Sequence, residues 1–79
     1  MRKIIEKKIL PEYFNEVIHN RKKFEIRKDE DGLQIGDAIF LKEWDGKKYT
    51  GRAVIRRITY VLRDVPEYGL MPGYVIFGW

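Results

Sequence analysis

Hydrophobic and polar residues recur with different periods along this chain, and the changes of period delimit its expected elements. The segment from Lys3 to Ile9 suits a first β-strand. Residues Pro11 to His19 are predicted to form a short amphipathic helix, because three apolar residues recur there at helical spacing: Phe14, Val17 and Ile18. Pro11 fits the first turn of that helix, where its missing N–H does no harm. Asn20 suits the left-handed conformation in which many helices end.

The segment after the helix has the two-residue period of a β-strand with one charged face. Within Lys23 to Arg27, Phe24 and Ile26 point to one side, while the charged residues point to the other: Lys23, Glu25 and Arg27. We therefore expect a strand that presents these charged side chains together.

A β-hairpin is predicted in the middle of the chain. Polar turns at residues 29–32 and at Gly36-Asp37 precede a strand from Ala38 to Trp44. Asp45-Gly46 is a strong hairpin signal, and a four-residue loop there would pair Trp44 with Tyr49.

The return strand of the hairpin is expected to be long, from Thr50 to Leu62. Its apolar residues lose strict alternation at Val54-Ile55, which predicts a bulge or a bend at that point. An irregular loop from Arg63 to Gly73 and a last strand from Tyr74 to Trp79 complete the chain.

The order of these elements is β-α-β-β-β-β, which predicts a mixed α+β, mainly β fold in a single domain over residues 1–79. A chain of 79 residues has too little material for a second core. A small barrel is favoured because closure removes exposed sheet edges. An open α+β sheet is the competing architecture.

Composition excludes several mechanisms. The chain contains no Cys, no Ser and one His, so thiol catalysis, a Ser-His-Asp triad and a His-rich zinc site cannot be built. We expect no cofactor and no metal, since the acidic run Asp29-Glu30-Asp31 is more typical of a solvated turn than of a magnesium site. No signal peptide or apolar run of about 20 residues is visible, so we expect a soluble cytoplasmic protein with no membrane contact. The net charge of +4 favours an anionic partner, and nucleic acid leads the candidates.

The highest concentration of chemistry lies at Lys22, Glu25 and Arg27. Arg27 could serve as a forked donor and Glu25 as an acceptor for amino groups of a planar polar ligand. By spacing alone, the three side chains fit a solvated salt-bridge ladder equally well, and such a ladder stabilises by only ~0–1 kcal/mol per pair.

The cluster resembles the ASCH motif Gly-x-Lys-x-x-Glu-x-Arg, with Asn20 in place of the Gly. The whole chain is similar to DUF3850, a small ASCH-related family of the PUA-like superfamily found in bacteria and their phages. The similarity is carried by segments along nearly the entire chain: Lys8 to Phe14, Phe24 to Lys28, Gly36-Asp37, Glu43 to Asp45, Tyr49 to Arg52, Thr59 to Leu62 and Gly73 to Val75. The resemblance implies a PUA-like β-barrel with the motif beside a cleft, and recognition of RNA or of a modified nucleobase or nucleoside.

The same resemblance leaves enzymatic activity open. A related ASCH branch hydrolyses N4-acetylcytidine with a lysine at the position of Lys22 and a threonine three residues later, where this chain has Glu25. Ribonuclease activity has also been proposed within the ASCH group. If the chain is an enzyme, Lys22 and Glu25 are the expected catalytic residues, with Glu25 as a general base on water.

Two further features bear on a nucleic-acid partner. Arg52 and Arg56 share one face of the long strand and are candidates to contact a phosphate backbone, or else to form a solvated basic face. Tyr68 lies in the irregular loop and is the aromatic residue that we expect to contact a ligand.

Overall fold

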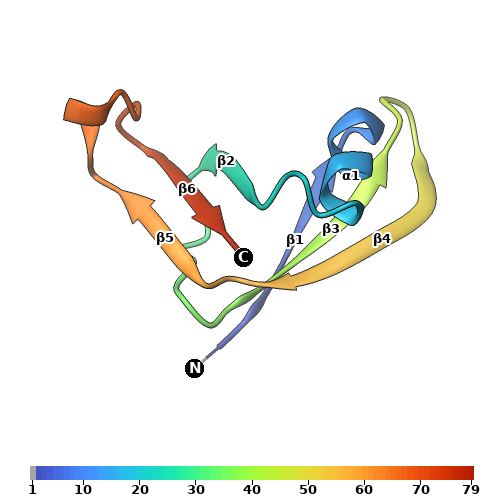
Figure 1. Cartoon of the computed structure of the whole chain (residues 1–79), viewed down its shortest axis with the longest axis horizontal. Helices are drawn as coiled ribbons and strands as arrows, with labels where there is room; N and C mark the ends of the chain where they lie inside the picture. Colours follow the sequence, from blue (N-terminus) through green and yellow to red (C-terminus); the bar gives the residue numbers. More distant parts are fainter. Residues whose placement is uncertain (1) are drawn as a thin grey trace.

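A computed structural model describes residues 2–79, and within this range it contains six strands, one α-helix and one short 3-10 helix (Figure 1). In chain order these are β1 (Ile4–Ile9), α1 (Pro11–Ile18), β2 (Phe24–Lys28), β3 (Ala38–Trp44), β4 (Tyr49–Arg57), β5 (Tyr60–Arg63), η1 (Pro66–Tyr68) and β6 (Tyr74–Gly78). No helix in the described range is long and apolar enough to cross a bilayer.

The strands form two three-stranded sheets. In the first sheet β3 lies between β1, which runs parallel to it, and β4, which runs antiparallel. In the second sheet β6 lies between β2 and β5, both antiparallel to it. Figure 1 shows the two sheets as the arms of a V, with α1 beside the first sheet. The predicted mainly β fold with one helix is confirmed, while the strand pairing of residues 2–79 gives two sheets and no closed barrel.

The chain passes from the first sheet to the second at Ile58. The backbone of Ile58 still belongs to the first sheet, because its N–H donates to the Asp37 carbonyl at 2.8 Å. The next N–H, of Thr59, donates at 2.8 Å to the Gly78 carbonyl at the end of β6. The predicted single strand over residues 50–62 is therefore wrong: the strand divides here into β4 and β5, because its hydrogen-bonding partner changes.

The predicted irregularity at Val54-Ile55 is also misplaced. Both residues pair regularly with β3, opposite Leu41 and Phe40. The register of the hairpin shifts closer to its turn, where Gly51 has a φ of +97° that non-glycine residues rarely adopt. The hairpin itself forms as predicted, with Trp44 opposite Tyr49.

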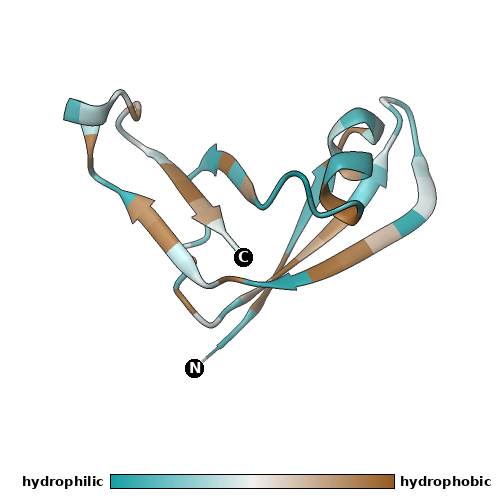
Figure 2. Cartoon of the chain, viewed as in Figure 1, coloured by the Kyte–Doolittle hydropathy of each residue, from teal (hydrophilic) through white to brown (hydrophobic). Residues whose placement is uncertain are grey.

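The core lies between the two sheets and under α1. Figure 2 shows hydrophobic segments on β3 to β6. Seven side chains are almost fully buried and come from both sheets, the helix and the crossing point: Phe14, Val17, Ile39, Leu41, Ile58, Val75 and Phe77. Edge strand β2 adds no apolar side chain to this core, since Phe24 is 46% and Ile26 53% exposed. Its buried side chain is Glu25, which lies opposite Phe77.

Asp37 joins the start of β1 to the turn before β3. Its buried carboxylate accepts the Lys3 N–H at 3.0 Å through Oδ1 and the Gln34 N–H at 2.8 Å through Oδ2. These two bonds, the Gln34 bond above all, hold the pKa of Asp37 below its usual range. Gly36 precedes it with a φ of +98°, so the Gly-Asp pair combines a left-handed turn with a carboxylate that binds two backbone donors.

Substitution of Asp37 by Asn is expected to lower the midpoint of thermal unfolding by roughly 5 °C at pH 7, because an amide cannot accept both N–H donors. A carboxylate with a lowered folded-state pKa stabilises the fold above its ordinary pKa, and this contribution is lost as pH falls through the lowered value. The difference between wild type and Asp37→Asn should therefore shrink on acidification.

Circular dichroism melts of both proteins between pH 7 and pH 3 would measure this difference. Asp64→Asn is the matched control, because Asp64 is exposed and has a φ of 58° that Asn also tolerates. A constant gap between wild type and Asp37→Asn at all pH values would contradict the role given to the ionised carboxylate.

Candidate functional site

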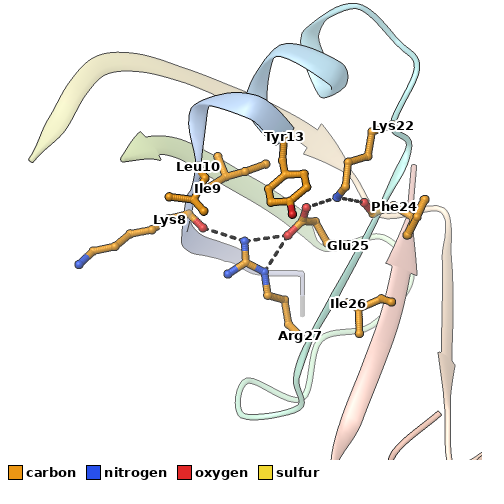
Figure 3. A pocket seen from close by; sticks show the side chains of 9 residues that line it. All are labelled: Lys8, Ile9, Leu10, Tyr13, Lys22, Phe24, Glu25, Ile26 and Arg27. Carbon is orange, nitrogen blue, oxygen red and sulfur yellow. Dashed lines mark hydrogen bonds and ion pairs between the residues drawn. The ribbon is translucent and has the colours of Figure 1, made fainter. Parts of the chain in front are cut away.

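A cleft of about 450 Å³ opens where β2 faces the end of β1 and the start of α1. Its lining combines apolar and charged side chains from these three elements and the loop before β2: Lys8, Ile9, Leu10, Tyr13, Lys22, Phe24, Glu25, Ile26 and Arg27 (Figure 3). All three residues of the sequence-predicted cluster, Lys22, Glu25 and Arg27, contribute to this lining. They converge on one concavity and do not form a ladder on an open surface.

The end of α1 places Lys22 at the cleft. Asn20 adopts the predicted left-handed conformation, with a φ of 61°. The chain then folds back, so that the N–H groups of Arg21 and Lys22 both donate to the Glu16 carbonyl, at 2.9 and 3.0 Å. This reversal turns the Lys22 side chain toward the strand that follows.

Glu25 is the central group of the cleft. Its side chain is only 7% exposed and lies between two cations. The Lys22 ammonium donates to Oε1 and also to the Phe24 carbonyl, the latter at 2.6 Å. Arg27 donates to Oε2 through Nε and lies within 2.7 Å of the same oxygen through Nη2. An ionised carboxylate is costly to bury without partners. These two cations offset that cost and allow Glu25 to be buried.

Arg27 also connects the two sheets. Its Nη2 donates at 2.7 Å to the backbone carbonyl of Lys8, on the outer edge of β1 (Figure 3). β1 and β2 are not neighbours in either sheet. The Arg27 side chain thus binds the Lys8 carbonyl, which a neighbouring strand would bind in a closed sheet. The cleft lies in the space beside this contact.

The cleft retains hydrogen-bonding capacity for a ligand. One guanidinium nitrogen of Arg27, Nη1, has no acceptor among residues 2–79. The Lys22 ammonium uses two of its three N–H groups on protein acceptors. Two cations and one carboxylate leave the cluster with one surplus positive charge. The site is therefore suited to a ligand edge rich in acceptor atoms.

Two aromatic rings flank Lys22, and both were missed as site residues. The ammonium of Lys22 lies 5.0 Å from the ring centroid of Phe24 and 5.8 Å from that of Tyr13. Both residues are 46% exposed. Tyr13 precedes the buried Phe14 on α1 and belongs to a segment with family resemblance, a signal that could have marked it. The alternation of the sequence marks Phe24 only as part of an apolar strand face.

Other sequence-predicted residues lie elsewhere. Tyr68 is 82% exposed in η1 and is not among the residues that line the cleft. In Figure 1 its segment, between β5 and β6, lies at the far side of the molecule from α1. Arg56 lies opposite the buried Ile39, and its guanidinium donates to the adjacent Ile55 carbonyl at 3.0 Å.

Arg52, a predicted phosphate contact, has a carboxylate partner within the protein. Its Nε and Nη2 bind the two oxygens of the buried Glu43 at 2.9 and 2.7 Å. Arg52 and then the Thr50 hydroxyl hold the pKa of Glu43 below its usual range. Arg52 also donates to the side chain of Asn15 on α1 at 3.0 Å, so a phosphate contact would compete with an existing network.

The acidic run at residues 29–31 is divided between two ion pairs. Asp29 binds Arg63 at 2.7 Å, and Asp31 binds Lys7 at 2.8 Å. These two ion pairs attach the loop after β2 to β5 and to β1.

Fold and site together define a small, mainly β domain with a charged cleft at the seam between two sheets. The family model for the domain of unknown function DUF3850 matches residues 4–79, and the chain belongs to this family. It is also similar to the "Uncharacterized 12.9 kDa protein in GpA 3'region" of Escherichia phage P2, with 41% identity over 61 residues. That match covers 77% of this chain and 56% of the phage protein, so the chain spans little more than half of that relative's length.

Substitution of Glu25 by Gln is expected to destabilise the fold by about 2 kcal/mol, because it leaves two cations without their charge partner. The cost should lie below the 3–5 kcal/mol of a fully buried pair, since Lys22 and Arg27 keep some solvent contact. Urea unfolding followed by tryptophan fluorescence would measure it, with the exposed Glu30→Gln as control. Equal stabilities of the two variants would contradict the central role of Glu25.

Proposed function

We propose that this protein is a PUA-like, ASCH-type domain whose cleft binds a nucleobase or nucleoside of RNA. The observation that carries the proposal is the convergence of Lys22, Glu25 and Arg27 on one cleft with half-exposed aromatic rings beside it. The motif predicted these residues as a binding set, and the geometry supports their use as one.

The cleft fits a nucleoside in size and in chemistry. Small-molecule sites are typically ~300–1,000 Å³ with apolar walls and a few polar groups, and this cleft measures about 450 Å³. The rings of Tyr13 and Phe24 offer flat apolar surface for a base. Arg27 and Lys22 supply donors for carbonyl oxygens or ring nitrogens on its edge.

Glu25 retains room for one amino group. A carboxylate has about four acceptor positions, and Glu25 accepts one hydrogen bond from Lys22 at Oε1 and one from Arg27 at Oε2, with Arg27 Nη2 also within 2.7 Å of Oε2. The acceptor position that neither cation approaches belongs to Oε1. A base that combines carbonyl acceptors with a single amino donor, such as a cytosine derivative, matches this distribution of groups.

Hydrolysis of a modified nucleoside or of RNA makes a further demand on the same residues. To accept a proton from water, Glu25 would need its free acceptor position aimed at that water or would have to release a cation. Binding needs neither step, and for this reason we place binding first.

The test is a titration of the isotope-labelled protein with cytidine, N4-acetylcytidine, uridine and adenosine, followed by NMR. Shift changes should centre on the cleft residues and be largest for the cytosine derivatives. Arg27→Lys keeps the charge but loses Nη1, the guanidinium nitrogen that is free for a ligand, so it should bind roughly tenfold more weakly, as expected for loss of a charged hydrogen bond. Tyr13→Leu should weaken binding while leaving the ion pairs intact.

Arg56→Lys is the matched control, because the same exchange there lies outside the cleft. Scattered shift changes, or equal affinity of Arg27→Lys and Arg56→Lys, would refute the proposal. Chromatography of the same mixtures detects product, and turnover that depends on Lys22 and Glu25 would establish the hydrolase instead.

A further inference from the structure

The end of the β3–β4 hairpin presents an ordered aromatic pair. Trp44 and Tyr49 face each other across the two strands, with ring centroids 5.1 Å apart and planes at 73°. Asp45 fixes the turn between them, since its carboxylate accepts the N–H groups of Lys47 and Lys48 at 2.8 and 2.9 Å. Tyr49 is 41% exposed, so part of its surface remains open to a ligand.

Four lysines surround this pair, and we call them the hairpin lysines: Lys8, Lys42, Lys47 and Lys48. Lys8 places its ammonium 3.9 Å from the ring centroid of Trp44, and Lys42 lies 4.3 Å from that of Tyr49. Lys47 and Lys48 are exposed in the turn.

The hairpin lysines outnumber the carboxylates beside them. Among residues 2–79, the ion pair that a hairpin lysine makes is the one between Lys42 and Glu6, and its length is 3.7 Å. Of the nearby acids, Glu43 is paired with Arg52, while Asp45 binds the neutral N–H groups of the turn and keeps its charge. Four hairpin lysines against the carboxylates of Glu6 and Asp45 leave this end of the molecule with two surplus positive charges.

Lys8 connects this surface to the cleft. Its carbonyl oxygen accepts from Arg27, while its side chain extends away from Arg27 (Figure 3). Lys8 lies opposite Lys42 in the register of β1 and β3, so the two side chains share one face of the first sheet. A ligand that leaves the cleft across β1 therefore meets the hairpin lysines next.

Exposed aromatic surface among cations that outnumber their carboxylate partners matches the chemistry of single-stranded nucleic acid. Phosphates bind to lysines, and unpaired bases stack on aromatic rings, which a duplex does not allow. We propose that the hairpin end is a second contact surface for single-stranded RNA, with the hairpin lysines on phosphates and Tyr49 as a stacking platform. That the same RNA strand runs from the cleft to this surface rests on the proposed function. Binding of RNA to the hairpin end is tested separately.

The experiment compares two double variants with the same change of charge. Lys47→Gln with Lys48→Gln removes two hairpin lysines. Lys23→Gln with Lys28→Gln removes two exposed lysines, one just before β2 and one at its end, that do not line the cleft. Binding of a fluorescent single-stranded RNA is measured from 50 to 300 mM salt. The hairpin double variant should reduce the slope of log affinity against log salt by roughly 1.4, as expected for two lost phosphate contacts. The control should leave the slope unchanged.

Tyr49→Leu tests stacking without a change of charge and should weaken RNA binding roughly tenfold. Duplex RNA and polyglutamate should bind at least tenfold more weakly than single-stranded RNA. Equal slopes for the two double variants, absence of RNA binding, or equal affinity for polyglutamate or duplex would each overturn the inference.

The nucleoside titration separates the two proposals. Hairpin-dependent RNA binding without nucleoside binding would support the hairpin surface and refute the cleft. Nucleoside binding, together with an RNA affinity that the hairpin substitutions do not change, would support the cleft and refute the hairpin surface. The hairpin double variant should leave nucleoside affinity unchanged, because neither lysine lines the cleft.

Discussion

Burial of the Glu25 carboxylate between two cations determines the orientation of β2. A strand with alternating apolar and charged residues ordinarily turns its apolar side to the core. Here Lys22 and Arg27 neutralise Glu25, and the charged side faces inward while Phe24 and Ile26 remain half exposed. Without those partners the charge would have to face water, and the opposite face of the strand would enter the core.

The position of the cleft follows from how the two sheets are joined. On one side the chain itself connects them, because β4 continues into β5 through the buried Ile58. On the other side β1 and β2 are not paired as strands, and Arg27 reaches across to the Lys8 carbonyl. A side chain at the seam satisfies one backbone group but fills less space than a strand pair. Because β1 and β2 are not paired, the two sheets stay separate on this side and the cleft lies between them.

Much of the local structure was predictable because it depends on neighbouring residues. The helix starting at Pro11, the left-handed Asn20 and the pairing of Trp44 with Tyr49 are all confirmed. Each follows from steric rules that act over a few positions. The division of the return strand at Ile58 was not predictable in this way. It arises because Asp37 and Gly78, far away in the sequence, are its successive partners.

The sequence by itself determined the helix, the order of the elements, the strands apart from the division between β4 and β5, and the three residues of the charged cluster. Only the tertiary structure decided that Glu25 is buried, that Tyr13 and Phe24 flank the cluster, and that Arg52 is engaged by Glu43. The physical reason is that a two-residue period separates the faces of a strand without assigning either to the core. That assignment depends on which distant groups neutralise a charge or accept a hydrogen bond, and folding alone brings those groups together.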